Sequence, residues 1–188
     1  MKTALAHVNS EGGPLIISDL ERVNVWNGAT SPEQYSLACS AISERDLATI
    51  RIGQVELALW DPGGPGTTFL IKRDSGLVYL VRFWANDELT DLQIAGLVDG
   101  VPPLSAEASL DVVSGQLLII WAAEDCSSLS PPSADSGIPR DNLSMGRTAF
   151  VMSVLPGKYT VGVSKYMKND IEVKLAELRK QPLIETSV

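Results

Sequence analysis

The chain has 188 residues and a formal net charge of −8, and 45% of its residues are hydrophobic. This length predicts a single domain over residues 1–188, with enough apolar material for a core and too much for a disordered chain. The negative charge disfavours binding to nucleic acids and to anionic membranes. No apolar run approaches the ~20 residues that span a bilayer, and no export signal precedes the domain, so we expect a cytoplasmic protein.

The chain is predicted to begin with a bend, a short strand and a turn. Gly12-Gly13-Pro14 marks the bend, and the apolar run from Leu15 to Ile17 is typical of a short strand. Trp26-Asn27-Gly28 is typical of a turn whose aromatic side chain is anchored in the core. These features place the start of the chain against a buried surface.

Two segments are predicted to be helical. Residues 31–42 carry Ser31 at the N-cap, Pro32 at the first helical position, and Gln34 where a capping box needs it. Residues 86–98 begin with cap-type residues and acids, followed by spaced leucines, which predicts a shorter second helix. The apolar spacing of the first helix predicts one buried stripe, formed by Tyr35, Ala38, Cys39 and Ile42.

Much of the remaining chain is predicted to form hairpins. Each of four segments contains two apolar, β-rich runs separated by a short turn with glycine. These segments are residues 47–60, 67–84, 106–123 and 148–166. Residues 170–180 alternate like a last strand, although Leu175 and Leu178 also fit a helix. The pattern predicts an α+β fold, mainly antiparallel β-sheet with one or two helices packed on it.

The segment from 67 to 84 is the expected centre of the sheet. Both faces of its second run are mostly apolar, which predicts a strand that is covered on both sides. Side chains expected to be mostly buried are Trp26, Tyr35, Cys39, Val81 and Phe83. If Phe83 is a core residue, Phe83→Ala should cost about 3–5 kcal/mol of stability.

Two further segments are predicted to be loops. The DPGGPG run from Asp61 to Gly66 contains two prolines and three glycines, which exclude a helix or an interior strand. It lacks the spacing of a phosphate-binding loop, and a strand rather than a helix follows it. Residues 124–145 are rich in Ser, Pro, Asp and Gly and are predicted to form a long loop.

The residue types that catalysis and metal binding require are sparse. His7 is the single histidine and is expected near a frayed terminus. Cys39 and Cys126 form no CxxC motif, and we expect free thiols rather than a disulfide. Acid pairs would serve a glycosidase or a cation site only if the fold placed them across a pocket. We therefore expect a protein that is not an enzyme and has no catalytic, cofactor or metal site.

Negative charge is concentrated in the middle of the chain. Between Arg82 and Arg140 there is no lysine or arginine, whereas nine acids occur there. A face built from this segment would attract a basic protein partner. The candidate contact residues are Asp87, Glu88, Asp91, Glu124, Asp125 and Asp135. The alternatives are that these acids are dispersed and only solubilise the protein, or that the contact lies at the Asp61–Gly66 loop.

Several motifs also carry a family resemblance. In chain order they are Glu11 to Ile17, Trp26 to Gly28, Tyr35 to Cys39, Leu57 to Phe69 and Val81 to Ala85, with a weaker echo at Pro156 to Val161. Roughly the first half of the chain thereby resembles the immunity-protein family numbered twenty-one in the bacterial polymorphic toxin series. The matched residues are mainly glycines, aromatics and apolar residues, which maintain a fold and do not identify a binding site.

The resemblance implies a function and no cofactor. Proteins of that family are expressed beside a secreted toxin of the same strain, bind its toxic domain and block it. The expected partner is then a cognate toxin domain with a basic surface, acting in the cytosol as a nuclease or on nucleotides. The alternatives are a β-rich interaction or regulatory module without a toxin partner, and a small hydrolase that uses carboxylates.

Overall fold

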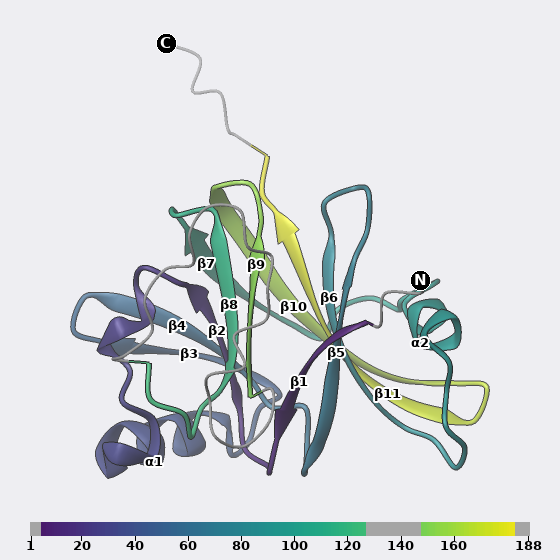
Figure 1. Cartoon of the computed structure of the whole chain (residues 1–188), viewed down its shortest axis with the longest axis horizontal. Coiled ribbons are helices and arrows are strands. Elements are labelled where there is room, and N and C mark those ends of the chain that lie inside the picture. Colours follow the sequence, from purple (N-terminus) through teal and green to yellow (C-terminus); the bar gives the residue numbers. More distant parts are fainter. Residues whose placement is uncertain (1–4, 127–147, 183–188) are drawn as a thin grey trace.

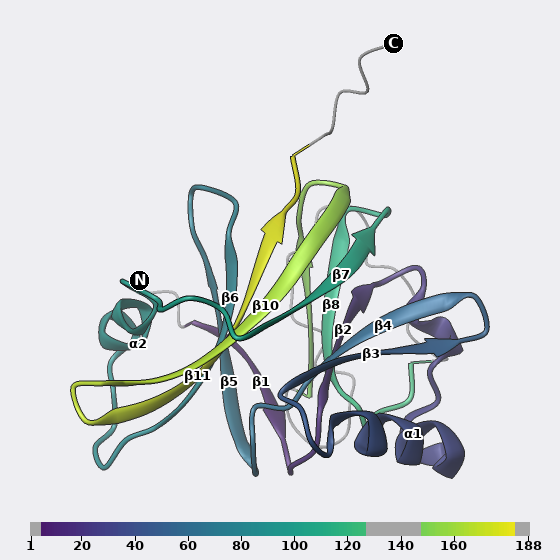
Figure 2. The same cartoon turned by 180° about the vertical axis from the view of Figure 1, so that it is seen from behind.

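The computed structural model describes residues 5–126 and 148–182, and within them the strands form two antiparallel sheets packed face to face (Figures 1 and 2). Sheet A contains, in spatial order, β1 (Ala6–Ser10), β5 (Gly66–Lys72), β6 (Val78–Trp84), β11 (Ile171–Lys180), β10 (Gly157–Lys168) and β7 (Ala106–Val112). Sheet B contains β3 (Leu47–Ile52), β4 (Val55–Trp60), β2 (Leu15–Asp19), β8 (Gln116–Trp121) and β9 (Ala149–Ser153). The predicted class, α+β with mainly antiparallel sheet, is confirmed.

Helices cover the outer face of each sheet. Helix α1 (Pro32–Ile42) and the 3-10 turns η1 (Val23–Val25) and η2 (Gly28–Thr30) lie beside sheet B, whereas α2 (Asp91–Leu97) lies beside sheet A at the opposite side of the molecule (Figure 1). No helix within residues 5–126 and 148–182 has the length and apolar content needed to cross a bilayer. The order of layers is therefore helix, sheet B, sheet A, helix.

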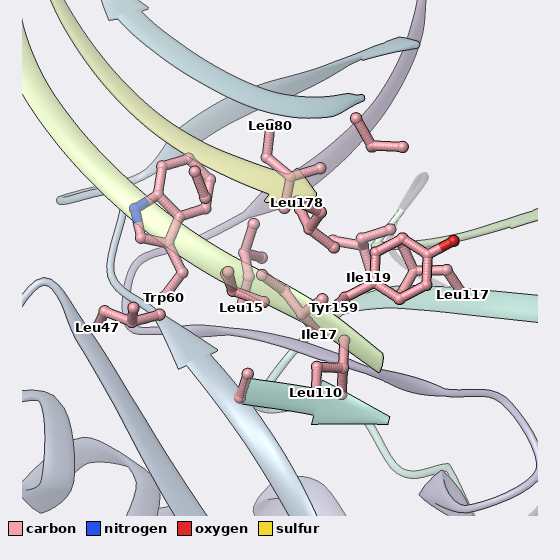
Figure 3. Close-up of a cluster of buried hydrophobic side chains, with 14 of the residues drawn as sticks. Leu15, Ile17, Leu47, Trp60, Leu80, Leu110, Leu117, Ile119, Tyr159 and Leu178 are labelled. Atoms are coloured by element: carbon pink, nitrogen blue, oxygen red, sulfur yellow. The ribbon is translucent and has the colours of Figure 1, made fainter. Parts of the chain in front are cut away.

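Three apolar clusters hold these layers together. The largest fills the space between the two sheets, where Trp60 of sheet B and Leu80 and Tyr159 of sheet A are buried (Figure 3). A second cluster joins sheet B to α1 through Trp26, whose indole Nε1 donates to the Ala122 carbonyl at 3.0 Å. A third joins the outer face of sheet A to α2. Part of each sheet is thus buried on both faces, which explains why strands such as β2 and β6 are apolar on both sides.

Local sequence patterns predict several features correctly. The β3–β4 and β5–β6 pairs are hairpins, and residues 171–180 form a strand, not a helix. Strand β6 lies between β5 and β11, and its residues 78–82 are buried on both faces. The turn at residues 26–28 is also confirmed, since Trp26 is fully buried.

The hairpins predicted at residues 106–123 and 148–166 are wrong. Strands β7 and β10 pair with each other in sheet A, whereas β8 and β9 pair with each other in sheet B. Both connections therefore cross from one sheet to the other. The β7–β8 and β9–β10 connections are in contact, since the Val154 amide of one donates to the Gly115 carbonyl of the other at 2.9 Å. Apolar alternation does not distinguish these arrangements, since either one buries the same faces.

The N-terminal strand was not expected from the sequence. Strand β1 pairs antiparallel with β5, and His7 lies opposite Phe69, so the predicted frayed terminus is wrong at this position. The ring centroids of His7 and Phe69 are 6.1 Å apart. Pairing with a neighbouring strand fixes a segment that has weak local propensity of its own.

The caps and buried stripe of α1 differ from the prediction. Ser31 makes no side-chain capping bond, and the Gln34 side chain instead accepts from the Asn27 amide at 2.8 Å and donates to the Val25 carbonyl at 3.1 Å. A capping box occurs in α2, between Thr90 and Gln93. On the stripe, Ala38 and Ile42 are buried, whereas Tyr35 and Cys39 are half-buried. The side chain of Gln34 thus ties the helix to the preceding turns.

Phe83 is also only half-buried, in contrast to Val81, which is fully buried. Its ring stacks on Phe69 of the neighbouring strand, with centroids 5.6 Å apart. Because part of the ring already faces solvent, Phe83→Ala should cost less than the range expected for a core aromatic. Phe83 packs against the cluster between sheet A and α2, so the prediction that it is mostly buried is confirmed, although it is not fully buried.

Both cysteines are free thiols, as predicted. Cys126 is fully buried in the cluster beneath α1. Burial, with smaller effects from Asp125 and Glu124, raises the pKa of the Cys126 thiol to about 12. The unfolded chain has a cysteine pKa of about 8.5. The folded protein therefore loses stability as the pH rises from about 8.5 toward about 12, because only the unfolded chain releases the proton in that range.

We expect the thiol of Cys126 to be protected from alkylation in the native protein. Its thiolate fraction at pH 8 should be about one in ten thousand, and alkylation needs the thiolate. Iodoacetamide at pH 8 should therefore modify Cys126 at least about 100-fold faster in denaturant than in native buffer. Peptide mass spectrometry would follow the reaction, and comparable rates in both conditions would contradict the buried position.

Candidate protein-binding surface

The structure separates the acids that the sequence identified as contact candidates. Asp87 and Glu88 are exposed in the connection from β6 to α2, and Asp91 is the first residue of α2. Glu124 and Asp125 follow β8 beside η2, where the Thr30 hydroxyl donates to the Asp125 carboxylate at 3.4 Å. The two groups lie at opposite sides of the molecule (Figure 1), and Asp135 lies outside the described residues.

The first acidic group adjoins an exposed tryptophan. Trp84 ends β6 with 39% of its surface exposed, and Asp87 and Glu88 follow within four residues. Trp84 pairs in the ladder with Glu172, which pairs in turn with the exposed Met167. We call these five residues the Trp84 surface. Trp84, Glu172 and Met167 lie on the face of sheet A that also carries the buried Leu80, whereas Asp87 and Glu88 lie in the connection after β6.

Charges around the Trp84 surface are unevenly paired. The Lys165 ammonium lies 2.7 Å from the Glu172 carboxylate, and this contact raises the pKa of Lys165. The Lys174 ammonium lies 3.0 Å from the carboxylate of Asp46, the residue that precedes β3 of sheet B. In contrast, neither Asp87 nor Glu88 forms an ion pair with any residue in the described part of the chain. The uncompensated charge beside Trp84 is therefore negative.

The DPGGPG loop supports Trp84 from one side. Gly63 has a φ of +87°, and a Cβ placed there would lie 3.3 Å from the edge of the Trp84 ring and 3.8 Å from the Lys174 ammonium. A side chain at this position would therefore strain the backbone and press on the ring, which would have to shift by a few tenths of an ångström. The Asp61 carboxylate fixes the loop by accepting from the Gly63 amide at 2.8 Å.

Arg82 holds the same loop from within the core. It lies two residues before Trp84 on the same face of β6 and is only 1% exposed. Its guanidinium donates to the carbonyls of Gly63, Gly64 and Gly66, and to the hydroxyls of Ser10 and Thr68. Burial lowers the pKa of Arg82 to about 10, so it stays charged at neutral pH, and the loop carbonyls offset that charge.

The roles of Trp84 and Arg82 were not predicted from the sequence, although the sequence contains a signal for Arg82. Arg82 is the only charged residue in an otherwise apolar strand, and a glycine-rich loop precedes that hairpin. A buried arginine needs several acceptors, and a loop with three glycines can turn its carbonyls toward one donor. The loop thus serves a structural cation rather than a phosphate.

Other clusters offer weaker sites for chemistry. No group of three or more His, Cys, Asp or Glu residues in the described ranges is placed to hold a metal ion. Glu56 and Asp111 do line one pocket of about 240 Å³ together with Arg22, Arg51 and Lys158. Glu56, however, forms an exposed ion pair with Arg51. One of the two acids of this pocket is thus already paired, so the pocket gives little support to the hydrolase alternative.

Comparisons with protein-family models, with curated proteins and with solved structures found no match for this chain. The assignment of function therefore depends on the residues and on the geometry of the Trp84 surface. That geometry is an exposed aromatic side chain at the end of a strand, followed by two carboxylates that form no ion pair within the described residues.

Proposed function

We propose that this protein is an immunity protein that binds and neutralises a cognate secreted toxin domain in the cytosol. The observation that carries the proposal is the exposed Trp84, followed in the chain by Asp87 and Glu88, which are exposed and form no ion pair within the described residues. The motif resemblance in the first half of the chain supplies the class of partner. The fold supports a binding role, because Trp84, Glu172 and Met167 lie on paired strands, and Asp87 and Glu88 lie in the short connection that follows β6.

The Trp84 surface has the composition of a binding hot spot. Tryptophan and methionine are enriched at the centres of protein interfaces, where they are surrounded by polar residues that exclude water. The ring of Trp84 lies close to Gly63, and Arg82 fixes the loop that carries Gly63. A side chain that is ordered before binding loses little conformational entropy in the complex, which favours high affinity.

The charge of this surface selects a basic partner. Asp87 and Glu88 would accelerate encounter with a positively charged protein and would slow encounter with nucleic acid. Enzymes that act on nucleic acids bind phosphates in basic clefts. An acidic inhibitor can occupy such a cleft in place of the phosphates, which fits a toxin that acts on nucleic acid or nucleotides.

A survival assay tests the function. The partner to use is the C-terminal domain of a large secreted protein encoded beside this chain. Expression of that domain alone should stop bacterial growth, and co-expression of this protein should restore it, with the two proteins purifying as a complex. Complex formation without protection would instead support an interaction module. If the two proteins form no complex and growth is not restored, the immunity proposal is wrong.

Charge reversal should identify which acidic group makes the contact. We expect Asp87→Lys with Glu88→Lys to slow association with the toxin domain by about 10-fold or more at low salt, and by less at high salt. Glu21→Lys with Glu44→Lys is the matched control, since it changes the net charge equally at exposed positions elsewhere. Stopped-flow fluorescence would measure the rates.

A third double variant, Glu124→Lys with Asp125→Lys, separates the two acidic groups. If the Trp84 surface makes the contact, this variant should associate at a rate close to that of the control. Slow association of this variant alone would move the contact to the η2 side of the molecule. Equal rates for all three variants at low salt would show that the acids only solubilise the protein.

A further inference from the structure

A second recess lies at the end of sheet A opposite to the Trp84 surface. It is framed by the β5–β6 turn, the β9–β10 connection and the end of β11, which all lie at the top of the molecule in Figure 1. Its volume is about 320 Å³. The residues that define its chemistry are Lys72, Leu77, Leu155, Tyr159, Arg179 and Lys180. The recess thus draws on segments that are far apart in the chain.

One side of this recess is apolar. Leu77 and Tyr159 form part of its wall, and Leu155 stands at its rim with 69% of its surface exposed. The Tyr159 hydroxyl donates to the Leu155 carbonyl at 2.7 Å, so the polar end of the tyrosine is occupied. Small-molecule sites are typically concave and mostly apolar, with a few polar groups that fix orientation, and this volume is at their lower limit.

The other side of the recess is cationic. Its lining includes Lys72, Arg179 and Lys180 and no acid, in a chain with a net charge of −8. The Lys72 ammonium donates to the Ser153 carbonyl, and Arg179 pairs with Glu177. Lys180 makes no ion pair within the described ranges. A cation without a counter-ion beside an apolar wall is suited to an anion that carries an apolar group.

The backbone also makes room for the Lys180 side chain. Gly157 has a φ of +149°, and a Cβ built there would lie 2.7 Å from the Lys180 Cε atom. Any larger residue at position 157 would displace the lysine stem. The stem therefore runs across Gly157, and the ammonium group is carried to the edge of the recess.

We propose that this recess binds a small amphipathic carboxylate. The apolar chain of the ligand lies against Leu77, Leu155 and Tyr159, and its carboxylate accepts hydrogen bonds from Lys180 with support from Lys72. This site is separate from the Trp84 surface and does not depend on the proposed function. Binding would be reversible, with no covalent step.

Titration of the purified protein with octanoate tests the proposal. Octanoate should shift the amide NMR signals of Leu77, Leu155 and Tyr159, and the shifts should saturate as its concentration rises. Octanol should bind about 10-fold more weakly because it lacks the charge. Lys180→Gln should weaken octanoate binding to the level of octanol. Leu155→Glu should abolish binding, and its exposed position makes loss of the fold unexpected.

Lys165→Gln is the matched control, because it removes one exposed lysine at the other end of sheet A and should leave octanoate affinity unchanged. Thermal denaturation of each variant would confirm that the fold is retained. Equal affinity of the wild type and Lys180→Gln for octanoate would overturn the proposal. The absence of any saturable shift at Leu77 and Tyr159 would do the same.

Discussion

Arg82→Met should lower the free energy of unfolding by about 3–5 kcal/mol, because it breaks a buried hydrogen-bond network. Methionine fills a similar length of space but donates no hydrogen bond. The carbonyls of Gly63, Gly64 and Gly66 would lose their shared donor, and so would the hydroxyls of Ser10 and Thr68. The two hydroxyls cannot turn to water, since Ser10 and Thr68 are buried, whereas the glycine carbonyls lie in a partly exposed loop.

Urea denaturation followed by tryptophan fluorescence would measure the loss. Arg51→Met is the matched control, because Arg51 forms an exposed ion pair with Glu56 and should contribute at most about 1 kcal/mol. Arg82→Lys should also be clearly destabilising, since an ammonium group has fewer donors and no planar fork. A loss below about 1 kcal/mol for Arg82→Met would contradict the structural role assigned to this residue.

Asp19→Ala should cost about 3 kcal/mol, since it removes charge-assisted hydrogen bonds from a buried site. The Asp19 carboxylate is fully buried and accepts from the amides of Glu21 at 2.8 Å, Val113 at 2.5 Å and Ser114 at 2.8 Å. Two of these amides belong to the connection that carries the chain from β7 in sheet A to β8 in sheet B. The substitution should therefore loosen the joint between the sheets.

Two measurements check this second prediction. Urea denaturation gives the total loss, and the exposed Asp111→Ala on β7 serves as the control, with an expected effect within about 0.5 kcal/mol. Amide hydrogen exchange should accelerate at Val113 and Ser114 in Asp19→Ala more than in the β3–β4 hairpin. Uniform acceleration over the whole chain, or no acceleration, would show that Asp19 does not hold this connection.

The contacts of Asp19 illustrate which parts of the fold can be predicted from the sequence and which cannot. The β3–β4 and β5–β6 hairpins follow from local turns and alternation, and α1 follows from its proline and apolar spacing. The β7–β8 crossing does not, because its partner Asp19 lies 94 residues away from Val113. Without that contact, the Ser114-Gly115 turn fits a hairpin equally well.

The candidate site was predictable only in part. The sequence identified Asp87 and Glu88 from their charge and their loop position, and it identified the Asp61–Gly66 loop as an alternative contact. It placed Trp84 on an apolar face of a central strand, and that face is indeed shared with buried Leu80. Trp84 is exposed because sheet B does not cover this end of β6, and local patterns do not show where a facing sheet stops.

Affinity of the toxin domain for Trp84→Ala, measured by isothermal titration calorimetry, tests the central claim most directly. Truncation of an interface hot spot typically costs at least about 2 kcal/mol, which is roughly 30-fold in affinity. Leu37→Ala on α1 is the control, since Leu37 is comparably exposed and lies on the other side of the molecule. We predict a loss of about 30-fold or more for Trp84→Ala and an unchanged affinity for Leu37→Ala. Wild-type affinity in a folded Trp84→Ala protein would contradict the proposed interface.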